Sequence, residues 1–409
     1  MNRKSLQDIC CESTPSAEGL HPSRSPIHTS TAYVCDSPDT AAAILEGRKP
    51  GYAYARDGHP NSDQLAAKCA ALHGAGRAVI TSSGMAATSL ALLSQLKSGD
   101  HVLLSSRLYG RTKTVVKELE KFGVSCSTVD VYDLEALAAV LADNSTLARQ
   151  TRMLIVETIS NPMLRVADLR EIAGICRKAD VLLTVDNTFA SPIACRPLEL
   201  GADLVIESLT KIMNGHGDVT LGMLCGRDDL FINMAETVAT WGMTAGPFDC
   251  WICERGLSTL FLRFTAACGN ALNISRQLQG LSGIERVVYP GLSTHPDHKK
   301  AASLLRDDSG KVVPGNMVTI QLTGGLPSAE RFIRDCGVHF VPSLGELTTT
   351  LSHPASTSHK SMPAAEREAL GIGDGIIRLS IGIESPDYVV GAIRDALVGL
   401  DFQGVSNVR

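Results

Sequence analysis

The sequence lacks the long hydrophobic run of a membrane-spanning helix, because no stretch of about 18 uninterrupted apolar residues occurs in its 409 residues. The first 30 residues contain no apolar segment of the kind found in secretory signals. Basic residues are not in excess either, since 38 Lys and Arg face 43 Asp and Glu along the chain. Binding to nucleic acid or to an anionic membrane requires a basic patch. We therefore predict a cytoplasmic protein with neither partner.

The sequence also lacks the paired cysteine motifs of a zinc site. Cys250 and Cys253 form a C-x-x-C, but no second pair lies at zinc spacing and no thioredoxin-like strand precedes them. In a chain of this length without a secretory signal, we expect the 12 cysteines to be mostly buried thiols. We therefore predict no metal site and place Cys250 and Cys253 in the core on a helix.

Short β-branched segments alternate with helical segments of roughly 10 to 15 residues from residue 61 onward. Such alternation predicts an α/β fold with a mostly parallel sheet and helices on both faces. Beyond about residue 260 the segments "GIERVVYP", "GNMVTIQLTG" and "GIIRLSIGIE" indicate a smaller α/β domain with a more antiparallel sheet. We place an extended arm at 1–55, a ligand-binding domain at 56–260 and a C-terminal domain at 261–409.

Candidate site residues follow the ends of the expected strands, where open α/β sheets bind ligands. "TSSGMAAT" turns from a strand into a helix at Gly84 and Met85, so its free N–H groups suit a phosphate, although a plain strand-helix turn has the same pattern. "VLLTVDNTF" ends a strand with Asp186, a carboxylate that needs a cation or serves as a helix cap. No G-x-G-x-x-G follows a candidate first strand, which excludes a dinucleotide-binding dehydrogenase.

"ESLTK" contributes two hydroxyl groups, Ser208 and Thr210, together with the amine of Lys211. Hydroxyl groups suit a phosphate and an amine suits a carbonyl carbon. An amine, an aspartate and a phosphate cradle are together what pyridoxal 5'-phosphate (PLP) requires. The sequence therefore predicts a PLP site.

On these residues the chain resembles the fold-type I PLP-dependent enzymes of cysteine and methionine metabolism. This family includes cystathionine γ-synthase, cystathionine γ- and β-lyases, methionine γ-lyase and O-acylhomoserine sulfhydrylases. The matching stretches include "YAYARDGHP", "SSGMAA", "LYGRT", "VETISNP", "VDNTFASP", "PLELGADLVIESLTKIMNGHGDV", "SLGE", "LSHPASTSH" and "IIRLSIGIE". The resemblance implies the transferase fold of that class with a seven-stranded sheet, and a dimer with shared active sites, commonly doubled into a tetramer.

The resemblance also implies roles for the cofactor-binding residues. Lys211 would hold the cofactor aldehyde and act as the mobile base, and Asp186 would pair with the pyridine nitrogen. Tyr109 would stack on the ring and assist proton movement. The phosphate would be bound by Gly84, Met85, Ser208 and Thr210 of one subunit and by Tyr54 and Arg56 of its neighbour.

The resemblance further assigns the α-carboxylate of the substrate to Arg378, with Asn161 and Ser343 as helpers. Two acidic positions of the cystathionine-handling members are Ala53 and Thr348 here, with Glu346 nearby as a substitute. Arg111 suggests a negatively charged distal group on the substrate, such as an O-succinyl or O-phospho group. His216 and His359 lie in matching motifs, and we interpret both as structural.

The function expected from these residues is γ-replacement or γ-elimination on an amino acid derived from homoserine or homocysteine. β-Elimination from cystathionine or cysteine uses nearly the same residues and is the first alternative. A catalytically idle relative that keeps the fold for binding or regulation is the second.

Overall fold

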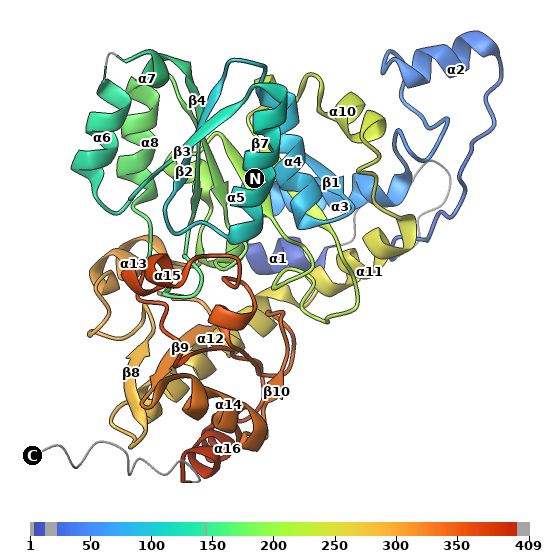
Figure 1. The fold of residues 1–409 in the computed structure, drawn as a ribbon. Coiled ribbons are helices and arrows are strands. Elements are labelled where there is room, and N and C mark those ends of the chain that lie inside the picture. The colour runs from blue at the N-terminus through green and yellow to red at the C-terminus, as the bar shows by residue number, and fades with distance from the viewer. Residues whose placement is uncertain (1–3, 13–22, 144, 399–409) are drawn as a thin grey trace, which may run out of the picture.

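The computed structural model describes residues 4–12, 23–143 and 145–398, and in this part it contains two β-sheets (Figure 1). The larger sheet has seven strands in the order β1-β7-β6-β5-β4-β2-β3. They are β1 (Arg77–Thr81), β2 (His101–Ser105), β3 (Ser125–Val129), β4 (Thr151–Glu157), β5 (Leu182–Asp186), β6 (Leu204–Glu207) and β7 (Gly222–Gly226). Strands β2 to β6 pair in parallel, and β7 runs antiparallel to both β1 and β6. The mostly parallel sheet predicted from the sequence is confirmed.

Helices cover both faces of this sheet because successive residues of a strand point to opposite sides. Along β6, for example, Leu204 and Ile206 join one core and Val205 joins the other. The first core includes α4 (Gly84–Gln95), α5 (Gly110–Glu118) and α10 (Met234–Thr240). The second includes α3 (Pro60–His73), α6 (Leu134–Ala142) and α8 (Leu169–Lys178).

The smaller sheet has the order β10-β11-β12-β9-β8, and only its β10 and β11 pair in parallel. Its strands are β8 (Ile284–Val288), β9 (Met317–Leu322), β10 (His339–Phe340), β11 (Thr350–Ser352) and β12 (Ile376–Ser380). Helices α12 (Leu260–Leu278), α14 (Gly325–Asp335) and α16 (Pro386–Val398) pack on it in a separate core. The antiparallel tendency expected for this part is confirmed.

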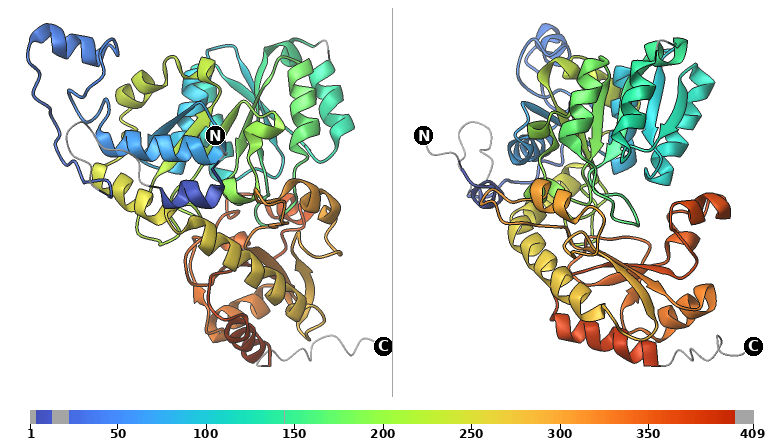
Figure 2. Two further views of the ribbon diagram at one scale, coloured as in Figure 1. Left: turned by 180° about the vertical axis from the view of Figure 1, so that it is seen from behind. Right: turned by 90° about the vertical axis from the view of Figure 1, so that its left-hand side faces the viewer.

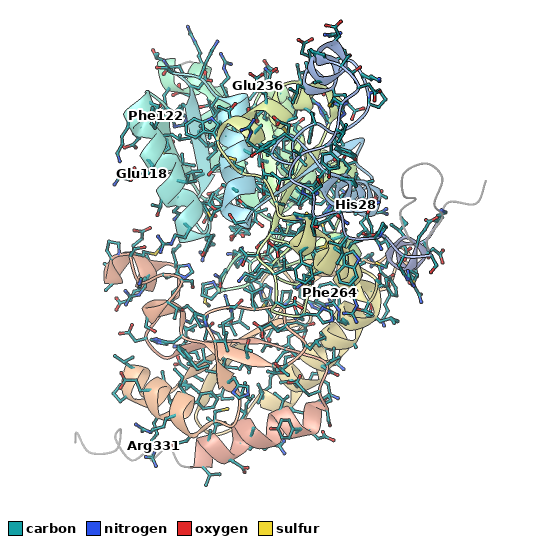
Figure 3. The ribbon with its side chains drawn as sticks, turned by 90° about the vertical axis from the view of Figure 1, so that its right-hand side faces the viewer. His28, Glu118, Phe122, Glu236, Phe264 and Arg331 are labelled. Carbon is teal, nitrogen blue, oxygen red and sulfur yellow. The ribbon has the colours of Figure 1, made fainter. Side chains whose placement is uncertain are left out.

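Helix α12 connects the two parts of the molecule and runs between them (Figure 2). Its Phe264, labelled in Figure 3, is buried in the core of the larger part, whereas Ile274 belongs to the core of the smaller one. The remaining helices are short and lie in the connections: α7 (Thr146–Gln150), α9 (Ser191–Ala194), α11 (Pro247–Leu257), α13 (His298–Leu304) and α15 (Ala364–Ala369).

The N-terminal segment contains two helices where the sequence indicated little periodicity. Helix α1 (Leu6–Cys11) buries Leu6 and Cys10 against the larger part, and Asp308 accepts a hydrogen bond from the Leu6 N–H. Helix α2 (Pro38–Leu45) has no buried residue, and its segment projects away from the body (Figure 1). The first helix is therefore part of the fold, and the second lies on a projecting arm.

All 12 cysteines are free thiols, and Cys250 and Cys253 are fully buried on α11 as expected. Within the described part of the chain, every helix is too short or too polar to cross a bilayer.

Candidate active site

A cavity of about 800 Å³ lies at the carboxyl ends of β4, β5 and β6 and is closed by segments of the smaller part. Ends of parallel strands meet at one edge of a sheet, so residues distant in sequence converge there. The cavity contains the predicted residues Gly84, Met85, Tyr109, Arg111, Asn161, Asp186, Ser208, Thr210, Lys211, Ser343 and Arg378.

Lys211 lies in a turn that follows β6 rather than in the strand itself. The turn is fixed by backbone hydrogen bonds from Lys211 N–H to the Ser208 carbonyl (3.1 Å) and from Gly215 N–H to the Lys211 carbonyl (2.8 Å). Its Nζ donates a 2.9 Å hydrogen bond to Ser343 Oγ. Burial, and then the charge of Arg378, lower the pKa of Lys211, with Glu346 opposing them. A lowered pKa leaves more of the neutral amine, which is the form that attacks carbonyls and accepts protons.

Arg263 supports this turn and was missed by sequence reasoning. From α12 its guanidinium donates to the carbonyl groups of Ile212 (3.3 Å), Met213 (3.1 Å) and Gly256 (3.0 Å). Its side chain therefore binds the segment directly after Lys211. The only sequence signal was a cation in a helix, which is ordinarily a solvated surface charge.

Two carboxyl groups lie side by side at the strand ends, because Asp186 of β5 pairs in register with Glu157 of β4. Asp186 Oδ1 accepts a 3.0 Å bond from Thr188 N–H, and Glu157 Oε1 accepts a 3.2 Å bond from Tyr109 N–H. Burial and the charge of Asp186 raise the pKa of Glu157 well above its usual range. Glu157 was also missed, although it ends a strand as Asp186 does.

The surroundings of Asp186 fit a protonated ring nitrogen. Burial raises its pKa despite the hydrogen bonds from Thr188. Among the described residues, no Lys, Arg or His lies within ion-pair distance of Asp186. A buried carboxylate without a cation is unfavourable, and a pyridinium N–H would supply the missing charge.

A phosphate fits beside Gly84, where the backbone approaches Ser208 closely. A Cβ atom on Gly84 would lie 2.9 Å from Ser208 Cβ, nearer than two carbon atoms approach without bonding. Ser83 caps α4 by accepting from Ala86 N–H, so the first turn presents its other N–H groups to the cavity side. Thr210 Oγ1 donates a 3.1 Å hydrogen bond to the Leu221 carbonyl and accepts one of 3.1 Å from the Leu221 N–H. In this structure the hydroxyl group therefore ties the turn after β6 to the residue before β7.

Arg378 on β12 is held in place by two hydrogen bonds. Its Nη1 donates to Asn161 Oδ1 (2.9 Å) and its Nη2 to the Ser343 carbonyl (3.0 Å). The residue is 5% exposed, and burial lowers its pKa to about 10. No described residue bonds to its Nε. A guanidinium that is buried without a carboxylate favours an anionic ligand.

The cavity entrance is cationic and rich in hydroxyl groups. Arg111 on α5 and Lys360 are both exposed, and Lys360 was not predicted. Near them lie Thr114, Ser356, Thr357, Ser358 and Ser361. Among the described lining residues, only Glu157 and Asp186 are acidic, and Ala53, Glu346 and Thr348 are not part of the lining. The entrance therefore suits an anionic substrate group better than a cationic one such as an ammonium group.

Tyr54 and Arg56 do not line this cavity in the described part of the chain. Tyr54 is 42% exposed, and the Arg56 guanidinium lies 5.0 Å from the centre of its ring. His216 bonds to the Asn214 carbonyl through Nδ1, and His359 is buried with Nδ1 bonded to Ser358 Oγ. Both histidines are held by neighbours in sequence.

A mostly parallel seven-stranded sheet whose strand ends meet a part-buried lysine, an aspartate, a strand-to-helix turn and a hydrogen-bonded arginine at one cavity defines a PLP-dependent enzyme of fold type I. Comparison with known proteins agrees, since the model of the Cys/Met metabolism PLP-dependent enzyme family matches residues 12–398. The chain belongs to this family.

Individual proteins in this family resemble the chain over nearly its whole length. It is 35% identical to an L-methionine gamma-lyase from Fusobacterium nucleatum subsp. polymorphum, over 91% of this chain and 92% of the relative. It is 37% identical to an O-succinylhomoserine sulfhydrylase from Pseudomonas aeruginosa, over 88% and 87%. The solved structure of cystathionine gamma synthase from Xanthomonas oryzae pv. oryzae with aminoacrylate and cysteine has a TM-score of 0.89 and 33% identity, over 97% and 98%.

Proposed function

We propose that this enzyme catalyses γ-replacement or γ-elimination on a homoserine- or homocysteine-derived amino acid. The main support is that Lys211, Asp186 and the Arg378 clamp line one cavity. The relatives support it as well, since a γ-lyase, a γ-synthase and a sulfhydrylase are similar along most of the chain.

Each side chain has a definite task in this proposal. Arg378 binds the substrate α-carboxylate, with Asn161 and Ser343 holding the guanidinium in place. Bound PLP would supply an electron sink for charge at the α-carbon, while Asp186 keeps the ring nitrogen protonated. Lys211 removes the proton from the α-carbon and then one from the β-carbon, after which the γ-substituent departs. Tyr109 and Lys211 line the same cavity, which supports a part for both in the proton transfers.

We propose further that the departing γ-substituent carries a negative charge. Arg111 and Lys360 at the entrance support this, because they face no acidic lining residue beyond the two carboxyl groups at the cofactor end. An O-succinyl or O-phospho group would pair with these cations. The distal ammonium group of cystathionine would be repelled by them.

Product analysis tests the proposal. The purified enzyme is supplied with O-succinylhomoserine, O-acetylhomoserine, methionine or cystathionine, each with and without cysteine, while 2-oxo acids and new thioethers are measured. We expect the highest kcat/KM with O-succinylhomoserine. A thioether product indicates replacement, and 2-oxobutanoate indicates elimination. Pyruvate from cystathionine as the main product would instead identify a β-lyase.

The charge preference has its own control within the enzyme. Arg111→Ala should raise KM for O-succinylhomoserine roughly tenfold and leave KM for the uncharged acetyl ester nearly unchanged, since one charge-assisted contact is lost. Thr114→Ala, on the same helix and in the same lining, serves as the matched variant. An equal effect of Arg111→Ala on both esters would contradict the preference.

We also propose a cytoplasmic homo-oligomer, a dimer or a tetramer, with shared active sites. The support is that Tyr54 and Arg56 lie off their own cavity on an exposed arm, where Val34 is fully exposed. The 12 free thiols suit a reducing compartment. If Arg56 serves the neighbouring subunit, mixed oligomers of inactive Arg56→Ala and Lys211→Ala chains should regain activity, because one site in each mixed pair is intact. No recovery on mixing would contradict shared sites.

A further inference from the structure

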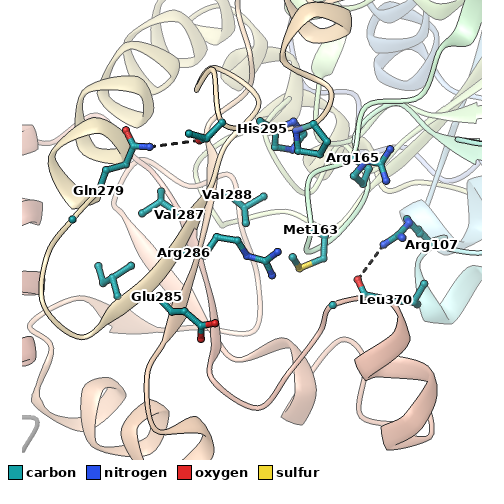
Figure 4. Close-up of a pocket in the computed structure, with 15 residues that line it drawn as sticks. Arg107, Met163, Arg165, Gln279, Glu285, Arg286, Val287, Val288, His295 and Leu370 are labelled. Atoms are coloured by element: carbon teal, nitrogen blue, oxygen red, sulfur yellow. Dashed lines mark hydrogen bonds between the residues drawn. The ribbon is translucent and has the colours of Figure 1, made fainter. Parts of the chain in front are cut away.

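A second cavity, of about 500 Å³, lies where the smaller sheet meets the larger part of the molecule. Arg107, Met163 and Arg165 line it from the larger part, and β8 contributes Glu285 and Arg286. Figure 4 shows the Arg286 guanidinium extending towards Met163, with Arg107 and Arg165 on the far side. The function proposed above uses none of these side chains.

Among the described residues, two of the three arginines, Arg107 and Arg286, have no carboxylate partner within ion-pair distance. Arg107 Nη1 donates to the Leu370 carbonyl (3.1 Å), and its buried Nε is without a partner in the described part of the chain. Arg286 Nη2 donates to the Gln321 side-chain carbonyl (3.0 Å), and Gln321 Nε2 donates in turn to Glu285. Arg165, in contrast, is neutralised directly by Asp297 at 2.5 Å. Arg107 is partly buried, and Arg286, although exposed, lines the same cavity, so the two guanidinium groups together favour an anion there.

Three cations lie near the aromatic ring of Tyr132, two of them Arg107 and Arg165 of the cavity lining. Arg165, Arg107 and Lys300 lie 4.5, 5.8 and 6.0 Å from the ring centre. A ring face attracts a cation without cancelling its charge. Lys300 also lies 3.5 Å from Asp297, which it shares with Arg165.

Opposing charges around the cavity are few. Glu285 is the one acidic side chain among the described lining residues, and it is exposed. Burial lowers the pKa of His295 to about 4, so this histidine adds no charge near neutral pH. The cavity is therefore positively charged overall.

We propose that this cavity binds a small dianion, either a phosphate or a dicarboxylate, at a site separate from the active site. Arginine forks match both groups, because two N–H donors meet two oxygens. The site adjoins the substrate clamp, since a small void lined by Arg107, Met163 and Asn161 lies between them. Asn161 is the residue that accepts the Arg378 hydrogen bond.

Calorimetric titration of the PLP-loaded enzyme tests the proposal, with inorganic phosphate and malonate as separate probes and chloride at equal ionic strength as the control. Loading with PLP occupies the cofactor's own phosphate site. We expect one saturable site per chain with a Kd on the order of 1 mM or lower for at least one probe. The probe that binds more tightly identifies the class of dianion.

Variants assign the site. Arg286→Ala should weaken binding at least about tenfold without changing activity measured in the absence of the probe. Arg286→Gln keeps a polar side chain without the charge and should weaken binding to the same degree. Agreement between the two variants would show that the loss does not come from misfolding. Arg331→Ala, on the outer surface of α14 (Figure 3), should bind normally. Arg378→Ala should also bind normally, because its cavity is a different one.

Three results would overturn the proposal. The first is no saturable binding of either probe to the wild-type enzyme. The second is unchanged binding in both Arg286 variants. The third is loss of binding in Arg378→Ala, which would assign the anion to the substrate clamp.

Discussion

Lys211 and Ser343, 132 residues apart in the chain, are joined by a 2.9 Å hydrogen bond from Nζ to Oγ. The carbonyl group of the same serine accepts from Arg378 Nη2 at 3.0 Å. Ser343 therefore links Lys211 to Arg378, because its hydroxyl group accepts from one and its backbone carbonyl from the other.

This division of roles predicts that Ser343→Ala lowers kcat about tenfold with little change in KM, because the amine loses its hydrogen-bond partner while the carbonyl still holds Arg378. Steady-state kinetics measure both constants. Ser361→Ala, in the same lining, is the control and should have a small effect. A large rise in KM with unchanged kcat would show that the hydroxyl serves substrate binding instead.

Lys211→Ala should abolish covalent attachment of the cofactor and lower kcat by at least about a thousandfold, because the other described lysine of the lining, Lys360, is exposed at the entrance. Mass spectrometry after borohydride reduction detects the attached cofactor. Lys113→Ala is the matched control, because burial lowers the pKa of Lys113 as well. Attachment lost in Lys113→Ala but kept in Lys211→Ala would reverse the assignment.

Arg378→Lys should lower kcat/KM roughly a hundredfold, mainly through KM, because an ammonium group does not reproduce the bidentate contact. Asn161→Ala should act in the same direction but less, roughly tenfold, since it removes one hydrogen bond to the guanidinium. Initial rates over a range of substrate concentrations separate the two constants. A fall in kcat alone would indicate that Arg378 acts on the reaction instead of on binding.

Gly84→Ala should weaken PLP binding and destabilise the fold, because its Cβ would lie 2.9 Å from Ser208 Cβ. Gly174→Ala, on α8 with nothing within 4 Å of the added Cβ, should stabilise the protein by roughly 0.5–1 kcal/mol instead. Unfolding with and without added PLP measures both quantities. Equal stability changes in the two variants would contradict the close approach at Gly84.

The buried His73 should make a contribution to the stability that is lost in acid. Burial lowers the pKa of His73 to about 3, so between about pH 3 and 6.5 the unfolded chain binds a proton that the folded chain does not. The contribution of His73 to stability therefore falls as the pH falls through this window, whereas the raised pKa values of Glu157 and Glu207 act in the opposite direction. Glu207 lies 3.4 Å away, and burial raises its pKa well above the usual range, so it offers His73 no charge.

His73→Gln should reduce the slope of unfolding free energy against pH by about 1.4 kcal/mol per pH unit within that window, because one titrating group is removed. Chemical unfolding at pH 5, 6 and 7 measures the slope. His298→Gln, at a partly exposed histidine, is the control. Identical slopes in wild type and His73→Gln would mean that His73 titrates normally in the folded protein.

That Asp186, Ser208 and Lys211 would lie together could be predicted, because they follow the ends of neighbouring strands. Asp186 closes β5, and Ser208 and Lys211 follow β6, its partner in the sheet. Glu157 also ends a strand, β4, next to Asp186 of β5. It was not predicted because PLP chemistry requires one carboxylate at the ring nitrogen, and Asp186 is assigned to it. Arg263 and Lys360 could not be predicted, because a lone cation in a helix or loop is usually a solvated charge.

The sequence by itself determined the alternating fold, the strand-to-helix turn at Gly84 and the place of Asp186 and Lys211 after neighbouring strands, because hydrophobic periodicity and strand ends are local properties of the chain. Only the tertiary structure decided that Ser343 would meet both Lys211 and Arg378, and that Arg107 and Arg286 would line one cavity. These contacts join the two sheets, and their geometry depends on how α12 and the segments that follow it pack against the larger part. Packing of that kind is set by the shapes of whole surfaces, which no short stretch of sequence contains.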